Sequence, residues 1–185
     1  MLTIGHRGAR GYIAENTLES IQKALDLNVD GVEIDVFRCA SGEIVVFHDK
    51  KLKRLTGHNG LIEETTFEEL KNILVAGRYR IPTLQQVLEK IDGKILLNVE
   101  LKGENTAIPT ATILKQYLSD SQSDIKKLIV SSKNWKELKL FKNLGTNIPI
   151  GVLSNYNIFL EKGLNDIIKK AKELNAIAIH PKFSI

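Results

Sequence analysis

The feature of the sequence that most limits its fold is a regular alternation of short apolar segments with longer amphipathic ones. The apolar segments read as strands over residues 3–6, 31–37, 95–101, 128–131, 148–153 and 176–180. The amphipathic segments between them read as helices, for example over residues 107–118, 135–144 and 164–174. Strands that are apolar on both faces are typical of parallel sheets covered by helices. The pattern therefore predicts an α/β fold with a parallel sheet.

The number of strands leaves two α/β architectures open. We count six main strands, plus a second strand at residues 44–47 that forms a hairpin with the strand at 31–37. A (β/α)8 barrel needs eight strands and usually about 250 residues. The 185 residues would suit a six-stranded doubly wound sheet, so length alone argues against a complete barrel.

The chain shows no linker rich in Pro, Gly or Ser, so we expect a single domain over residues 1–185. A charged excursion over residues 52–80, with one helix expected at 66–74, reads as a small insertion after the second strand and its hairpin partner.

Composition excludes several classes of function. The single Cys39 rules out an internal disulfide and a cysteine-based zinc site, and we expect it to have no special role. The densest basic cluster, residues 50–54, has no interleaved aromatic residue, so we expect a solvated surface and no nucleic-acid partner. No apolar run approaches the roughly 20 residues of a membrane span. No apolar signal segment precedes the first strand, so we expect a cytoplasmic location; a signal removed before residue 1 would leave the same sequence.

Carboxylates interrupt two strands that are otherwise apolar. In "GVEIDVF", Glu33 and Asp35 are two residues apart, which places both side chains on one face of a strand. In "LLNVELKG", Asn98, Glu100 and Lys102 share a face in the same way. Three buried carboxylates at neighbouring strand ends form an oxygen-only site suited to Ca²⁺ or Mg²⁺. The alternative is that they point outward and pair with lysines, which is uncommon within apolar strands.

Two histidines follow apolar strands close to this expected site. His6 ends the first strand and His48 ends the hairpin strand, where Asp49 could orient its ring. Two imidazoles beside a metal suit a general acid and a general base. Arg7 offers a fork of donors that matches a phosphate, and Lys102 adds a second positive charge.

Three other polar residues have simpler interpretations. Asn16 reads as a helix N-cap, with Glu19 in the capping-box position. His58 lies in a polar loop and is expected to have no role. His180 could line the mouth of the site, but we favour a structural role.

Four segments together resemble the glycerophosphodiester phosphodiesterase family in order, spacing and chemistry. They are "HRGARGYIAENT", "GVEIDVFRCASGEIVVFHDKKLKRLT", "IPTLQQVLE" and "LNVELKG", and "AIAIHPKFS" looks like that family's sixth strand. The resemblance implies a TIM-type (β/α)8 barrel and metal-dependent hydrolysis of glycerophosphodiesters to glycerol 3-phosphate and an alcohol. The insertion would help to shape the alcohol pocket.

The resemblance also implies a role for each motif residue. His6 and His48 would be the acid-base pair, and Glu33, Asp35 and Glu100 would hold Ca²⁺ or Mg²⁺. Arg7 and Lys102 would contact the phosphate, and Asn16 would either support the site or cap the helix. The nucleophile could be water or the glycerol 2-hydroxyl of the substrate.

The chain departs from the family pattern after the sixth strand, where the family has a seventh and an eighth. We expect an open side between the first and sixth strands. A longer chain, a natural truncation or a partner chain in an oligomer would each account for it, and we favour the first.

Two other functions compete with the phosphodiesterase. A non-catalytic binder of glycerophosphate or lipid head groups would not need two histidines, and a related phospholipase D should carry a more apolar insertion.

Overall fold

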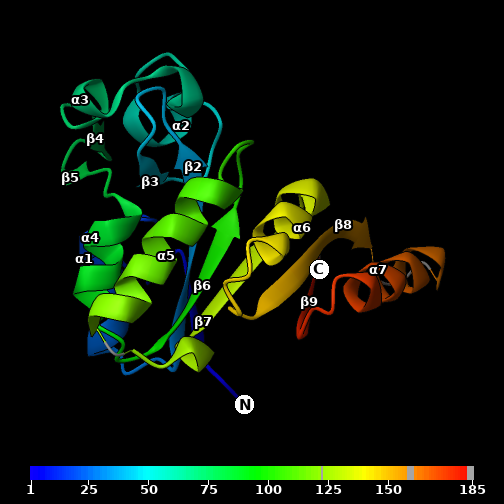
Figure 1. Cartoon of the computed structure of the whole chain (residues 1–185). Helices are drawn as coiled ribbons and strands as arrows, with labels where there is room; N and C mark the ends of the chain where they lie inside the picture. The colour runs from blue at the N-terminus through cyan, green and yellow to red at the C-terminus, as the bar shows by residue number, and fades with distance from the viewer. Residues whose placement is uncertain (122, 158–160, 183–185) are drawn as a thin grey trace.

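The computed structural model describes residues 1–121, 123–157 and 161–182, and within this part a parallel sheet forms the centre of the molecule (Figure 1). Its strands lie in the order β1-β2-β6-β7-β8-β9, and β3 pairs antiparallel with β2. The strands are β1 (Ile4–His6), β2 (Gly31–Arg38), β3 (Ile44–Val46), β6 (Leu96–Leu101), β7 (Leu128–Ser132), β8 (Ile150–Asn157) and β9 (Ala178–Lys182). All the expected strands are therefore present, with ends shifted by a few residues.

The strand order decides between the two architectures. Each parallel strand is added beside the one before it, always in the same direction along the sheet. A doubly wound sheet instead reverses its order at a switch point, so that alternative is wrong. The connecting helices are α1 (Leu18–Asp26), α4 (Leu84–Ile91), α5 (Ala107–Ser121), α6 (Trp135–Asn143) and α7 (Glu161–Glu173), and consecutive helices from α1 to α6 contact one another (Figure 1). The described residues thus form a partial (β/α) barrel with an outer layer of helices.

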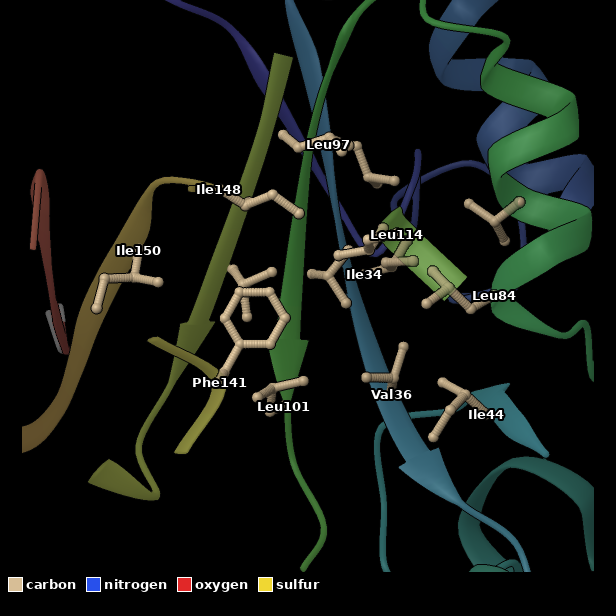
Figure 2. Packing of buried hydrophobic residues seen from close by; sticks show 14 of the residues in the cluster. Ile34, Val36, Ile44, Leu84, Leu97, Leu101, Leu114, Phe141, Ile148 and Ile150 are labelled. Carbon is tan, nitrogen blue, oxygen red and sulfur yellow. The ribbon is translucent and has the colours of Figure 1, made fainter. Parts of the chain in front are cut away.

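The main hydrophobic core lies between the sheet and these helices. Ile34 and Val36 of β2 and Leu97 of β6 point toward the helices, where they meet residues such as Leu84 and Phe141 (Figure 2). Strand side chains alternate between faces, so the residues between these apolar ones face the opposite side of the sheet. The opposite face therefore carries Glu33, Asp35, Asn98 and Glu100.

The N-terminal cap of α1 differs from the sequence-based expectation. Thr17, in an extended conformation, accepts a hydrogen bond from the Ser20 backbone N–H, so Thr17 and not Asn16 is the N-cap. Asn16 has a left-handed backbone, with φ of 58°, which does not suit an N-cap. The capping box of α4 is confirmed, because Thr83 and Gln86 each accept a backbone hydrogen bond from the other.

The insertion forms a small module with its own apolar cluster. It contains α2 (Lys53–Thr56), η1 (Ile62–Glu64), α3 (Phe67–Leu70), β4 (Leu74–Val75) and β5 (Tyr79–Arg80). The helix expected at 66–74 is too long, because the chain turns after α3 so that Leu74 can pair with Arg80. The cluster consists of Phe37, Cys39, Val45, Phe47, Leu52, Ile62, Leu70, Val75 and Ile81.

Both edge strands lack a second neighbour within the described residues. β1 pairs only with β2, and β9 pairs only with β8. Ile177, just before β9, is 70% exposed, and Ile179 and Ile4 are 36% and 40% exposed. Apolar side chains therefore face solvent at the two edges of the sheet. In the part of the chain that the structure describes, no helix has the length and apolar character needed to cross a membrane.

Candidate active site

The register of the parallel strands brings the predicted carboxylates together at one end of the sheet. Glu33 of β2 lies beside Asn98 of β6, and Asp35 lies beside Glu100. One oxygen from each of Glu33, Asp35 and Glu100 lies within 4.8 Å of the others, and all three residues are buried. The alternative in which these carboxylates point outward to surface lysines is therefore wrong.

Burial makes it unfavourable for all three carboxylates to be ionised without a cation. Burial, followed by the charges of Asp35 and Glu100, raises the pKa of Glu33 to about 8. Burial also raises the pKa of Glu100, against the opposing charge of Lys102. Oε1 of Glu33 and Oδ1 of Asp35 are buried and accept no hydrogen bond, although the Lys102 ammonium lies 3.5 Å from Oδ1 of Asp35. Buried carboxylate oxygens without donors are suited to a hard cation, so these residues fit the predicted metal site.

Asn16 holds one of these carboxylates in place. Its Nδ2 donates to Oδ2 of Asp35 at 2.9 Å, and its Oδ1 accepts from the Asp35 backbone N–H at 3.3 Å. The left-handed backbone turns the side chain toward β2 and away from the start of α1. Of the two roles considered for Asn16, the contacts match support of the site rather than capping.

Arg7 lies in a strained turn directly after β1. Its φ is 56°, and Gly8 follows at φ of 77°, where a Cβ would lie 2.6 Å from the Ser20 hydroxyl. Left-handed backbone is uncommon for residues other than glycine and is often found at functional sites. The Arg7 backbone N–H donates to Oε2 of Glu33 at 3.0 Å, and its Nε lies 3.4 Å from Oδ2 of Asp35. The turn thus places the guanidinium beside the carboxylate cluster.

His48 lies between a carboxylate and an ammonium group. Its Nδ1 lies 2.5 Å from Oδ1 of Asp49, a carboxylate that can only accept, so Nδ1 carries the proton. Its Nε2 lies 3.2 Å from Nζ of Lys102. The same ammonium lies 3.5 Å from Asp35 and 3.3 Å from Glu100. Lys102 therefore connects His48 to the carboxylate cluster.

His6 reaches the site from β1. Its Nε2 lies 3.6 Å from Oε2 of Glu33, and its side chain is 51% exposed. Burial, followed by the charges of Arg10 and Arg7, lowers the pKa of His6 to about 4. Burial also lowers the pKa of His48, although the hydrogen bond to Asp49 opposes this shift. Both imidazoles are therefore neutral near pH 7 in the absence of a ligand.

Two contributors to the site were not among the predicted site residues. Glu15 accepts from Nη1 of Arg7 at 2.8 Å, and Arg54 of α2 contacts both Glu15 and Asp49. Arg54 belongs to the basic cluster that we expected to be solvated. Its spacing of five residues from Asp49 was the available signal. Glu15 belongs to the segment "HRGARGYIAENT", but that motif alone does not show that Glu15 contacts Arg54.

The two remaining histidines differ in position. The register of β8 and β9 pairs His180 with Leu153, and the His180 ring packs against Gly151. Burial lowers the pKa of His180. His58 is exposed in the insertion, as expected.

Comparison with known proteins agrees with this topology. The model of the glycerophosphoryl diester phosphodiesterase family matches residues 6–183. A glycerophosphodiester phosphodiesterase of Caldanaerobacter subterraneus subsp. tengcongensis is 30% identical over 193 residues, which cover 97% of this chain and 75% of that protein.

Two solved structures are also similar. A phosphodiesterase of Oleispira antarctica, in complex with the product sn-glycerol-3-phosphate, has a TM-score of 0.82 and 30% identity, and the match covers 98% of this chain and 74% of that one. A glycerophosphodiester phosphodiesterase of Thermotoga maritima has a TM-score of 0.76 and 26% identity, with coverage of 98% and 74%. The strand order and the buried carboxylates agree with a family match over nearly the whole length. The chain therefore belongs to the glycerophosphoryl diester phosphodiesterase family.

Proposed function

We propose that this chain hydrolyses glycerophosphodiesters to glycerol 3-phosphate and an alcohol, with a divalent cation and two histidines. The observation that carries this proposal is the buried cluster of Glu33, Asp35 and Glu100, two of which have oxygens without donors, beside His6 and His48. Family membership and the similar phosphodiesterase with bound sn-glycerol-3-phosphate support the choice of substrate.

Glu33, Asp35 and Glu100 would hold Ca²⁺ or Mg²⁺, since an all-carboxylate set suits hard cations. When bound, such an ion supplies positive charge that stabilises the phosphate oxygens in the transition state. Asn16 holds the carboxylate and the backbone of Asp35 in place by its two hydrogen bonds.

The residues of the chain can bind the phosphate and move the protons. Arg7 and Lys102 offer donors to the phosphate oxygens. His6, which burial and then its arginine neighbours keep neutral, would remove the proton from the nucleophile. His48 would protonate the leaving alcohol oxygen from Nε2, once the negative charge of the bound phosphate has favoured protonation of that nitrogen and the Asp49 carboxylate stabilises the resulting imidazolium. The nucleophile is either water or the glycerol 2-hydroxyl, which would form a cyclic phosphate first.

A non-catalytic binder fits these contacts less well. Binding of a phosphate requires cations, whereas the Asp49–His48 pair fixes a ring tautomer, which is a feature of proton transfer. The phospholipase D alternative is disfavoured, because it should carry an apolar insertion. Helix α2 of the insertion instead carries Lys53 and Arg54 and has no buried residue.

The proposal is tested by incubating the chain with glycerophosphocholine in EDTA and then adding Ca²⁺ or Mg²⁺. Release of glycerol 3-phosphate is measured, and circular dichroism checks the fold. We expect turnover only after a cation is added, and the more effective ion identifies the preferred metal. Turnover in EDTA would contradict the metal role, and binding without turnover by a folded chain would favour the binder. A transient cyclic phosphate seen by phosphorus NMR would identify the 2-hydroxyl as the nucleophile.

As the alternative to the favoured longer chain, we propose that a second copy of the chain covers the exposed sheet edges. The unpaired sides of β1 and β9 and the exposure of Ile177 at 70% support such an association. Light scattering should show a dimer or larger species that Ile177→Lys dissociates, whereas a monomer at all concentrations would exclude it. The cytoplasmic location expected from the sequence stays a prediction.

A further inference from the structure

Among the described residues, the hydrogen bonds between the insertion and the candidate active site come from the side chain of Arg54. This residue lies on the short helix α2, which buries none of its own residues. Its guanidinium nevertheless contacts two carboxylates at once. Nε and Nη2 donate to the two oxygens of Asp49, the second at 3.0 Å. Nη2 and Nη1 donate to the two oxygens of Glu15, at 2.7 and 3.3 Å.

The two carboxylates lead to different parts of the site. Asp49 accepts from Nδ1 of His48, the proposed acid. Glu15 accepts from Nη1 of Arg7, the proposed phosphate ligand, at 2.8 Å. One guanidinium thus lies between the group that would move a proton and the group that would bind the phosphate.

Both carboxylates depend on Arg54 for their charge balance. The side chains of Glu15 and Asp49 are only 12% and 22% exposed, so water solvates them poorly. The hydrogen bonds from Arg54 are the largest cause that lowers the pKa of Asp49 to about 2. Although burial opposes it, the bonds from Arg54 and then Arg7 also lower the pKa of Glu15. Without Arg54, Glu15 would keep Arg7 as its cationic partner, whereas Asp49 would keep the bond from neutral His48, and the two poorly solvated negative charges would face each other across the same gap.

Paired contacts of a planar fork also fix geometry. A guanidinium that makes two parallel bonds to a carboxylate defines both its position and its orientation. Asp49 in turn sets the ring orientation and tautomer of His48, and this directs Nε2 toward Lys102 at 3.2 Å.

We propose that Arg54 is a positioning residue that orients His48 through Asp49 and Arg7 through Glu15, and so couples docking of the insertion to assembly of the active site. The catalytic part of this inference rests on the proposed phosphodiesterase function. The tautomer of His48 does not, because it is a property of the protein alone.

The test compares Arg54→Gln with Lys53→Gln, which removes the same charge from the neighbouring exposed position on α2. We expect R54Q to lower kcat/KM for glycerophosphocholine by about 10- to 100-fold, since small misplacement of reacting groups has effects of this size. K53Q should match wild type. Nitrogen-15 NMR of the histidine rings should show Nδ1-protonated His48 in wild type and K53Q, and a mixture of tautomers in R54Q.

A double-mutant cycle separates positioning from general stability. If Arg54 acts through both carboxylates, R54Q should cost less in an Asp49→Asn or a Glu15→Gln background than in wild type, and should add little when both substitutions are present. Wild-type kcat/KM with an unchanged His48 tautomer in R54Q would overturn the proposal, and so would strictly additive losses. If R54Q does not fold, Arg54→Lys takes its place: one ammonium cannot make both paired contacts, so wild-type kcat/KM and tautomer in R54K would overturn it. An inactive wild-type chain would refute the phosphodiesterase function instead, and the tautomer comparison would still decide the role of Arg54.

Discussion

The two histidines of the site differ in their nearest charged neighbours. His48 has a carboxylate on one ring nitrogen and an ammonium near the other, so its tautomer is defined. His6 has only the longer contact of 3.6 Å to Glu33 and lies in the field of Arg7 and Arg10. These surroundings favour different roles in proton transfer for two residues that look equivalent in the sequence.

Replacement of His48 tests its role most directly. We expect His48→Ala to lower kcat by about 10²- to 10⁴-fold, the usual contribution of a general acid or base. His58→Ala, at an exposed position in the insertion, is the matched control and should keep wild-type turnover. Steady-state assays together with circular dichroism check both variants. A folded H48A protein with wild-type kcat would refute the acid-base assignment.

The carboxylate cluster makes a separate prediction about metal affinity. Glu100→Gln keeps the size of a buried side chain but removes the charge of one of the three carboxylates that could hold a cation. We expect its Kd for Ca²⁺ or Mg²⁺ to rise by about 10-fold or more, since metal sites depend on the charge of their ligands. Calorimetric titration measures the Kd, with Glu89→Gln on the exposed face of α4 as control. An unchanged titration of E100Q would show that Glu100 is not a ligand.

Among the helices and strands, local signals predicted some features well and failed where distant contacts decide. The cap of α4 could be read from Thr83 and Gln86 because a capping box is local. The cap of α1 was assigned to Asn16 instead of Thr17, because the bond from Asn16 to Asp35 joins residues 19 positions apart. Arg54 is exposed, as expected for the basic cluster, but its contact with Glu15 could not be predicted, since the two residues are 39 positions apart.

The cap of α4 yields a prediction at this scale. Thr83→Ala removes the hydroxyl that accepts from the Gln86 backbone N–H at 3.3 Å. The free energy of unfolding should fall by about 1 kcal/mol, the usual effect of losing a Thr cap. Thr83→Ser keeps the hydroxyl and should stay within a few tenths of wild type. Urea denaturation of the three proteins measures the difference, and equal stability of T83A and wild type would show that the box does not stabilise the helix.

For the whole molecule, the alternation of strands and helices predicted the fold class, and the strand order chose between the two architectures. Composition and length could not make that choice, because a six-stranded doubly wound sheet and six strands of a barrel need the same elements. The alternation within β2 and β6 also predicted which side chains share a face. It could not predict the register, which sets Asp35 beside Glu100 and brings the carboxylates within 4.8 Å.

The buried carboxylates should make the stability of the metal-free protein depend on pH. The pKa of Glu33 is about 8 in the folded chain, against 4.5 as its ordinary value. The folded state therefore binds more protons than the unfolded state between these values, so its stability should fall as pH rises. The lowered pKa of His6, about 4, acts in the opposite direction, but only below its ordinary value of 6.5. Between pH 6.5 and 8, the pH dependence of stability therefore reports on the carboxylates and not on His6.

In EDTA, we expect the free energy of unfolding to fall between pH 6.5 and 8 by at most about 1.4 kcal/mol per pH unit, the limit for one proton. Glu33→Gln has no proton to lose and should show a flatter profile in the same window. Saturating Ca²⁺ or Mg²⁺ should flatten the wild-type profile as well, because a bound cation favours the ionised carboxylates. Denaturant titrations at several pH values measure these slopes. A wild-type slope equal to that of E33Q would mean that Glu33 is already ionised, and that the cluster is compensated by Arg7 and Lys102 alone.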